Sequence, residues 1–137
     1  MPMTPAEGQQ ILADNFAPWV QDLGLRVERT DEREATLRLP FDARLVRVGG
    51  SVCGQALMAA ADTAMVIAVS AALGGFRPMA TVGQNVTFFR PVVNKDVLVT
   101  ARVLKLGKTL VFGEIAMHPE GSAEASAHAT TTYAMAG

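Results

Sequence analysis

Asp62 is the residue whose type and position point most directly to chemistry. It lies inside an apolar stretch, with Ala-Ala-Ala before it and Thr-Ala-Met after it. A carboxylate is costly to bury unless it is paired or used, and in a reaction centre it can act as a general base. The alternative is that Asp62 caps a neighbouring element or faces solvent at a dimer seam, and composition favours neither.

Gly54 begins the same stretch, where free backbone N–H groups and the positive end of a helix would converge. Such groups suit a developing oxyanion, although glycine at an ordinary helix start is a common alternative. Gly54 and Asp62 are eight residues apart, which in a helix is about 12 Å along the axis. Because both cannot then contact one carbonyl carbon, we expect Gly54 of one chain to face Asp62 of another in a homodimer.

The predicted helices are one short N-terminal segment and one long core element. Apolar residues recur at helical spacing over residues 7–22, and Pro18 is expected to break or kink that helix. Residues 41–51 are predicted to be a loop. Gly54–Leu73 consists of strong helix formers and is followed by a Gly-Gly stop signal. It is apolar almost all round, so we expect it to be buried on most faces.

The remaining segments have the composition and alternation of strands. Residues 25–29 and 35–39 alternate as a hairpin, and four further strands are expected to form an antiparallel meander. The fold class is therefore α+β, with the sheet wrapped around one long helix. We expect a single domain over residues 1–137, with an N-terminal helical segment at 1–22. The four further strands are predicted at 79–90, 96–106, 109–118 and 123–135.

Composition narrows the possible partners. The net charge is −1 and basic residues are scattered, which argues against nucleic acid. The single cysteine excludes an internal disulfide, and two histidines ten residues apart do not form a metal motif. Residues 1–10 lack the pattern of a signal peptide, and residues 56–73 are judged too short and too weakly apolar for a membrane span. We therefore expect a cytoplasmic protein without a cofactor or metal.

Several motifs together resemble a known family. Residues 49–55 (Gly-Gly-Ser-Val-Cys-Gly-Gln) and 61–65 (Ala-Asp-Thr-Ala-Met) resemble the helix motif of hotdog-fold thioesterases of the phenylacetate-degradation type. Residues 81–91 resemble their central strand, and residues 105–110 their basic strand–turn–strand motif. The resemblance covers roughly residues 20–135 and is specific for the family, but it does not identify a substrate.

This resemblance implies a hotdog fold and hydrolysis of an acyl-CoA with a medium-chain or aromatic acyl group. In the implied mechanism, the backbone N–H of Gly54 polarises the thioester carbonyl. Asp62 of the partner subunit is the general base or the nucleophile, and Thr81 holds the water or the carboxylate. Family members form homodimers that often pair into homotetramers. The candidate substrate and CoA contacts are Arg47, Gln55, Arg90, Lys105 and Lys108, although a solvated side chain near a turn is an equal alternative for each lysine.

Two departures from the family pattern affect the expected mechanism. Cys53 stands where many relatives carry histidine. The proposed role of Gly54 depends on its backbone N–H, so the loss of the histidine need not abolish that role. Arg47 stands where relatives carry Asn or Gln, so it could orient the carbonyl or pair with Asp62 and make it a weaker base. A nucleophilic role for Cys53 is disfavoured because no histidine is near it in sequence to activate the thiol.

Two other functions remain open at the level of sequence. A hydratase or dehydratase of acyl thioesters would need a histidine beside a carboxylate, whereas His118 and His128 fall on late strands. A non-catalytic acyl-CoA-binding protein would keep the pocket and lack a base, and the presence of Asp62 argues against it.

Overall fold

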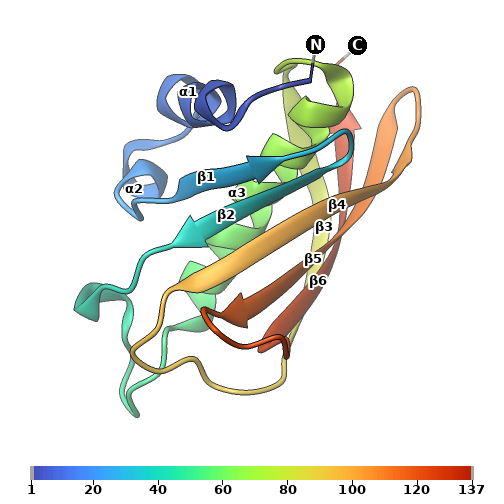
Figure 1. Cartoon of the computed structure of the whole chain (residues 1–137). Coiled ribbons are helices and arrows are strands. Elements are labelled where there is room, and N and C mark those ends of the chain that lie inside the picture. Colours follow the sequence, from blue (N-terminus) through green and yellow to red (C-terminus); the bar gives the residue numbers. More distant parts are fainter. Residues whose placement is uncertain (1, 137) are drawn as a thin grey trace.

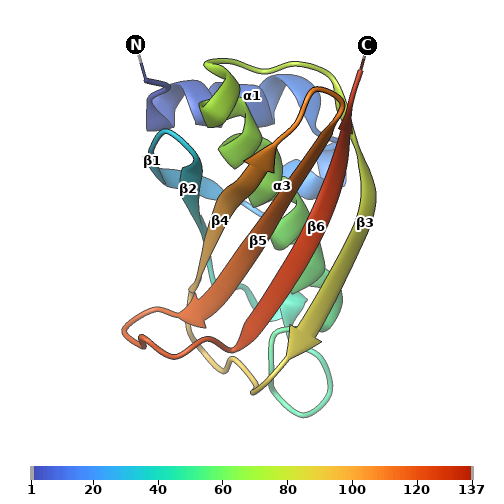
Figure 2. The same cartoon turned by 90° about the vertical axis from the view of Figure 1, so that its right-hand side faces the viewer.

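The computed structural model describes residues 2–136, in which a six-stranded antiparallel sheet curves around one long helix (Figure 1). This confirms the predicted α+β arrangement. The helices lie on one face of the sheet and leave the other face bare (Figure 2). The elements are α1 (Pro5–Asn15), α2 (Pro18–Gln21), β1 (Arg26–Thr30), β2 (Glu34–Leu39), the 3-10 turn η1 (Ala43–Leu45), α3 (Gly54–Leu73), β3 (Met79–Phe88), β4 (Val97–Leu106), β5 (Leu110–Pro119) and β6 (Ala127–Met135).

The N-terminal segment forms two helices instead of one kinked helix. α1 begins before the predicted start because Thr4 and Glu7 form a capping box, in which each backbone N–H donates to the other side chain at 2.9 and 3.2 Å. The helix ends at Asn15, and α2 begins at Pro18, a position where proline is tolerated because its missing N–H would have no helical partner. The predicted break at Pro18 is confirmed.

Helix α3 has the predicted bounds. Cys53 precedes it in an extended conformation, and Gly74 ends it with φ 79°, a left-handed conformation that glycine adopts without a steric penalty. Its length and the mean hydropathy of 1.9 of its most apolar 18 residues would suffice for a membrane span, so the expectation that this stretch is too short and too weakly apolar was wrong. However, 72% of those 18 residues are buried inside the protein. α3 is therefore the core helix of the sheet and not a membrane span.

The strand order corrects the predicted meander. The order is β1-β2-β4-β5-β6-β3, so β4, β5 and β6 form a meander while β3 crosses over to pair with β6 at the edge. The eight residues between β3 and β4, 89–96, pass beneath the ends of the intervening strands (Figure 2). β4 consequently pairs with β2 on its other side. This crossover places β3 on the open edge of the sheet.

Alternating residues of the meander face α3 and form the core. On β5, the inward position of Gly113 lies so close to α3 that a Cβ there would be 2.1 Å from the Met65 methyl group. The same Cβ would lie 2.9 Å from the backbone carbonyl oxygen of Arg102, so a larger residue here would require both the Met65 thioether and the backbone of β4 to shift. On β6, the inward positions 127, 129, 131, 133 and 135 are all buried. The side chain of Tyr133 therefore points toward α3.

Candidate active site

Asp62 is held by two hydroxyl groups from the two neighbouring strands at the sheet edge. The carboxylate is half-buried on α3 and accepts a hydrogen bond of 2.8 Å from Thr81 Oγ1 on β3. Tyr133 of β6 also donates to the Asp62 carboxylate, and its hydroxyl oxygen lies 2.7 Å from the Asp62 backbone carbonyl oxygen. Thr81 and Tyr133 are directly paired across β3 and β6. The sheet therefore fixes the orientation of this carboxylate.

Tyr133 is a neutral hydrogen-bond donor at any pH near neutrality. Burial raises the pKa of its phenol above the usual range, and the charge of Asp62 and their hydrogen bond raise it further. Tyr133 is not among the residues predicted from the sequence. A signal was present, because Tyr133 is the single tyrosine of the chain and occupies an inward position among small buried residues. Its hydroxyl needs a partner when buried.

An apolar cavity of about 380 Å³ lies beside Asp62. The amide Nε2 of Gln84 on β3 donates to the Met58 carbonyl at 3.1 Å, while its Oε1 is buried and has no partner among the residues that the structure describes. Gln55, a predicted contact residue, lines this cavity and is exposed. The full lining is Phe16, Trp19, Val20, Gln55, Met58, Ala59, Asp62, Thr63 and Gln84. Its volume lies within the range of small-molecule sites.

The start of α3 forms a second hollow of about 440 Å³. Gly54 is the first helical residue, so its N–H has no partner within the helix. A Cβ on Gly54 would be 3.3 Å from the ring of Phe88. Arg47 and Arg90 line the same hollow. The predicted contact residues Arg47 and Arg90 therefore share one site with Gly54. The positive charge of the two arginines and the free N–H of Gly54 suit an anionic ligand.

Arg47 does not pair with Asp62 of its own chain. Its guanidinium donates to the Val48 carbonyl at 2.7 Å, beside the loop that precedes α3. Arg90 forms an ion pair with Glu124, and both side chains are more than half exposed, so this pair contributes little to stability. Both arginines are thus available at the surface near Gly54.

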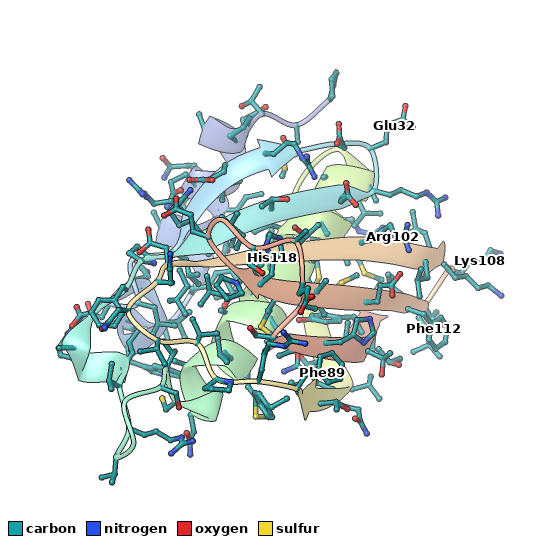
Figure 3. The ribbon with its side chains drawn as sticks, turned by 60° about the horizontal axis from the view of Figure 1, so that its bottom comes forward. Glu32, Phe89, Arg102, Lys108, Phe112 and His118 are labelled. Atoms are coloured by element: carbon teal, nitrogen blue, oxygen red, sulfur yellow. The ribbon has the colours of Figure 1, made fainter. Side chains whose placement is uncertain are left out.

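Within one chain, the two remaining predicted contact residues, Lys105 and Lys108, lie at the end of the sheet opposite Gly54. Phe88 pairs with Ala127 at one end of β3, and Met79 pairs with Met135 at the other. The β4–β5 turn, which carries Lys108, belongs to the second end because the N–H of Met135 donates to the carbonyl of Thr109 at 2.8 Å. Figure 3 shows Lys108 well apart from Phe89, which follows β3 at the first end. Lys105 and Lys108 are therefore remote from Gly54 and closer to the end that carries Thr81 and Asp62.

Neither histidine joins the Asp62 cluster. His128 alternates with the inward residues of β6 and contacts Glu114 at 3.1 Å on the bare face of the sheet. His118 lies near the far end of β5, opposite Leu98. Cys53 is half-buried just before α3. Among residues 2–136, no three His, Cys, Asp or Glu side chains are grouped as a metal site.

Comparisons with known proteins decide the family. The model of the thioesterase superfamily matches residues 49–126, which include Gly54, Asp62 and Thr81. The chain belongs to the thioesterase superfamily. A protein of Halobacterium salinarum that is named as an esterase is 33% identical over 102 residues. That match covers 69% of this chain and 66% of the relative, just under two thirds of the relative's length.

Solved structures confirm that this thioesterase-superfamily chain has the hotdog fold. A protein of Silicibacter species described as a thioesterase is 31% identical, with a TM-score of 0.87 and coverage of 98% of this chain and 93% of that one. The PaaI protein from the phenylacetic acid degradation operon of E. coli has a TM-score of 0.84 at 19% identity, covering 98% and 97% of the two chains. The likeness to PaaI is one of fold and agrees with the predicted hotdog fold, while membership of the thioesterase superfamily rests on the family model and the relative of 31% identity.

The hydrogen bond from Tyr133 gives a testable expectation for this superfamily member. We expect Tyr133→Phe to lower kcat/KM for thioester hydrolysis by about tenfold or more, because a hydrogen bond to a charged group contributes about 1.5–3 kcal/mol. Steady-state kinetics with a thiol reporter would measure the loss. Thr131→Val is the matched control, since its hydroxyl lies on the same strand and donates to Gly83 at 3.1 Å, not to Asp62. An equal loss in both variants would show that Tyr133 acts through strand stability alone.

Proposed function

We propose that this protein is an acyl-CoA thioesterase that hydrolyses medium-chain or aromatic acyl-CoA to the free acid and CoA. The observation that carries the proposal is the half-buried Asp62 carboxylate, oriented by Thr81 and Tyr133 beside an apolar cavity. Asp62 either removes a proton from the attacking water or attacks the carbonyl carbon itself. In the first route water adds to the carbonyl carbon as Asp62 takes its proton, and the C–S bond breaks. In the second route Asp62 displaces CoA and forms a mixed anhydride, which water then hydrolyses to the free acid and the restored carboxylate. In both routes one proton of the water ends on the sulfur of CoA, which leaves as the thiol.

The open edge strand β3 supports a homodimer. Most residues of β3 are exposed, including Val82 with 62% of its surface accessible. A long edge with unpaired backbone N–H and C=O groups is a template for pairing with a strand of another chain. A two-fold axis through the middle of β3 would pair it antiparallel with the same strand of a second copy. The Phe88 end of one β3 then lies beside the Met79 end of the other.

This dimer brings the two halves of the site together. Gly54 lies against Phe88 at one end of β3, whereas Asp62 is bonded to Thr81 near the other end. With paired strands about 5 Å apart, Gly54 of the partner subunit approaches Asp62 of this chain. The partner's free helix N–H then faces the thioester oxygen, and Asp62 faces the water or the carbonyl carbon.

The same pairing gathers the basic candidates around one substrate. Lys105 and Lys108 belong to the end of the sheet that would meet Arg47 and Arg90 of the partner subunit. Arginine and lysine side chains bind phosphate groups through charge and N–H donors, so we assign these four residues to CoA. Gln55 and the apolar cavity beside Asp62 then receive the acyl group. Because CoA thioesters are intracellular metabolites, we place the reaction in the cytoplasm.

The bare face of the sheet supports pairing of two dimers. It carries the exposed apolar residues Leu104 and Phe112, with 52% and 38% of their surface accessible. Figure 3 shows Phe112 on this side of the meander with Arg102. An apolar group on an uncovered sheet is typical of an interface, so we propose a homotetramer built from two dimers. Light scattering at several protein concentrations would measure the assembly.

The direct test of the proposed function is turnover of acyl-CoA. Purified protein would be incubated with phenylacetyl-CoA, benzoyl-CoA and a series of saturated acyl-CoAs, and free CoA would be followed with a thiol reporter. Release of CoA from at least one member, above the rate of spontaneous hydrolysis, is expected. If no member of the panel is hydrolysed, the protein is not an acyl-CoA thioesterase of this class.

A site shared between subunits predicts complementation between two inactive variants. Chains carrying Asp62→Asn or Gly54→Pro would be co-expressed with different tags, and the doubly tagged dimer would be isolated. Each such dimer holds one site with both native residues and one with neither, so we expect about half of the wild-type activity per dimer. Dimers of either single variant are the controls. A hybrid that is no more active than these controls would place Gly54 and Asp62 in the same chain's site.

A further inference from the structure

Trp19 stands at the end of the apolar cavity that contains Asp62. It belongs to the four-residue helix α2, and 61% of its surface is exposed although it is the single tryptophan of the chain. α2 is held by polar bonds at both ends. Gln21 Nε2 donates to the Phe16 carbonyl at 2.7 Å, and Arg44 donates to the Asp22 carbonyl at 3.3 Å. These bonds hold the backbone of α2, and the indole lines the cavity that contains Asp62.

A second cavity of about 320 Å³ is also lined by Trp19. Trp19 and Gln55 line both this cavity and the cavity that contains Asp62, so these two side chains form the wall between them. The second cavity is apolar over most of its surface. Its other lining residues are Asp22, Leu23, Arg44, Leu45, Cys53 and Ala56.

The two cavities therefore adjoin along α3 at Trp19 and Gln55, and the indole is the larger of these two side chains. Met58, Ala59 and Trp19 line the same cavity as Asp62, so an acyl chain whose carboxyl carbon lay at Asp62 would extend along them. A chain that is short enough ends at the indole. A longer chain must displace the indole before it can reach Leu45 and Ala56.

We propose that Trp19 sets the upper length of the acyl group, as a specificity-determining residue at the far end of the acyl pocket. The inference rests on the proposed thioesterase function for its kinetic consequence. In this arrangement, the methyl end of a bound, linear acyl chain contacts the indole of Trp19. Removing the indole joins the two cavities and lets longer chains bury more CH₂ groups.

The kinetic test compares Trp19→Ala with wild type over saturated acyl-CoAs from four to sixteen carbons, in terms of kcat/KM. Each additional CH₂ that becomes buried is expected to contribute about a fourfold gain. We therefore expect the ratio of kcat/KM for long over short chains to rise by about tenfold or more. Trp19→Phe should give a smaller rise, because its ring still fills part of the wall. Phe41→Ala is the control, since Phe41 is 38% exposed and lines neither cavity.

A change that is equal at all chain lengths would overturn the assignment of Trp19, while wild-type turnover would still support the thioesterase function. The single tryptophan also provides a readout without turnover. In the Asp62→Asn variant, bound acyl-CoAs above a threshold length should shift the emission of Trp19, and shorter ones should bind without a shift. Binding itself would be measured by calorimetry. If acyl-CoAs bind but none shifts the emission, or if none binds, the inference is wrong. A length-dependent shift in a protein that hydrolyses no acyl-CoA would retain Trp19 as the length limit and overturn the catalytic proposal.

Discussion

Asp62→Asn is expected to lower kcat/KM for acyl-CoA hydrolysis by about 10²–10⁴-fold, the range typical of a lost general base. Asparagine has nearly the same shape and keeps an oxygen that accepts from Thr81 and Tyr133, so the fold should be retained. The amide cannot take a proton from water, and it is a poor nucleophile toward a thioester. Initial rates at saturating and limiting substrate would measure the loss.

The control for this variant is Asp14→Asn, which removes an exposed carboxylate on α1 that is bonded to Gln10. We expect its turnover to match wild type. Thermal unfolding and light scattering would show that Asp62→Asn is folded and assembled. Unchanged turnover in a folded Asp62→Asn protein would exclude Asp62 as base or nucleophile.

Gly54→Pro is expected to lower kcat by about 10²–10³-fold, the cost of removing one oxyanion donor. Proline removes the backbone N–H and leaves the rest of α3 in place, because the first helical position tolerates it. The preceding residue, Cys53, already has φ −68° and ψ 149°, which is compatible with a following proline. The loss should appear mainly in kcat, since the donor acts where negative charge develops.

Gly54→Ala separates the loss of the N–H from crowding. Alanine retains the donor and adds a Cβ that would lie 3.3 Å from the Phe88 ring. That contact requires a shift of a few tenths of an ångström, so we expect a loss of at most about tenfold. If alanine and proline reduce kcat to the same extent, the N–H of Gly54 is not the oxyanion donor. The effect would then come from the contact with Phe88.

The local chemistry of the sequence was sufficient to predict most elements. Gly54–Leu73 could be placed to the residue because strong helix formers end at Gly74, whose left-handed conformation is a local preference of glycine. The break at Pro18 follows from its missing N–H. Asp62 could be selected as the candidate acid because burial of an isolated carboxylate within an apolar helix is costly.

Contacts between distant residues required the tertiary structure. β3 crosses to the edge beside β6, and no local pattern distinguishes that arrangement from a simple meander. This crossover brings Thr81 and Tyr133 together on Asp62, from segments 19 and 71 residues away. It also opens the edge through which we propose that the partner's Gly54 approaches. The sequence by itself determined which helix carries the acid. The sheet order decided which side chains orient it, because strand pairing depends on the packing of the whole core and not on neighbours in the chain.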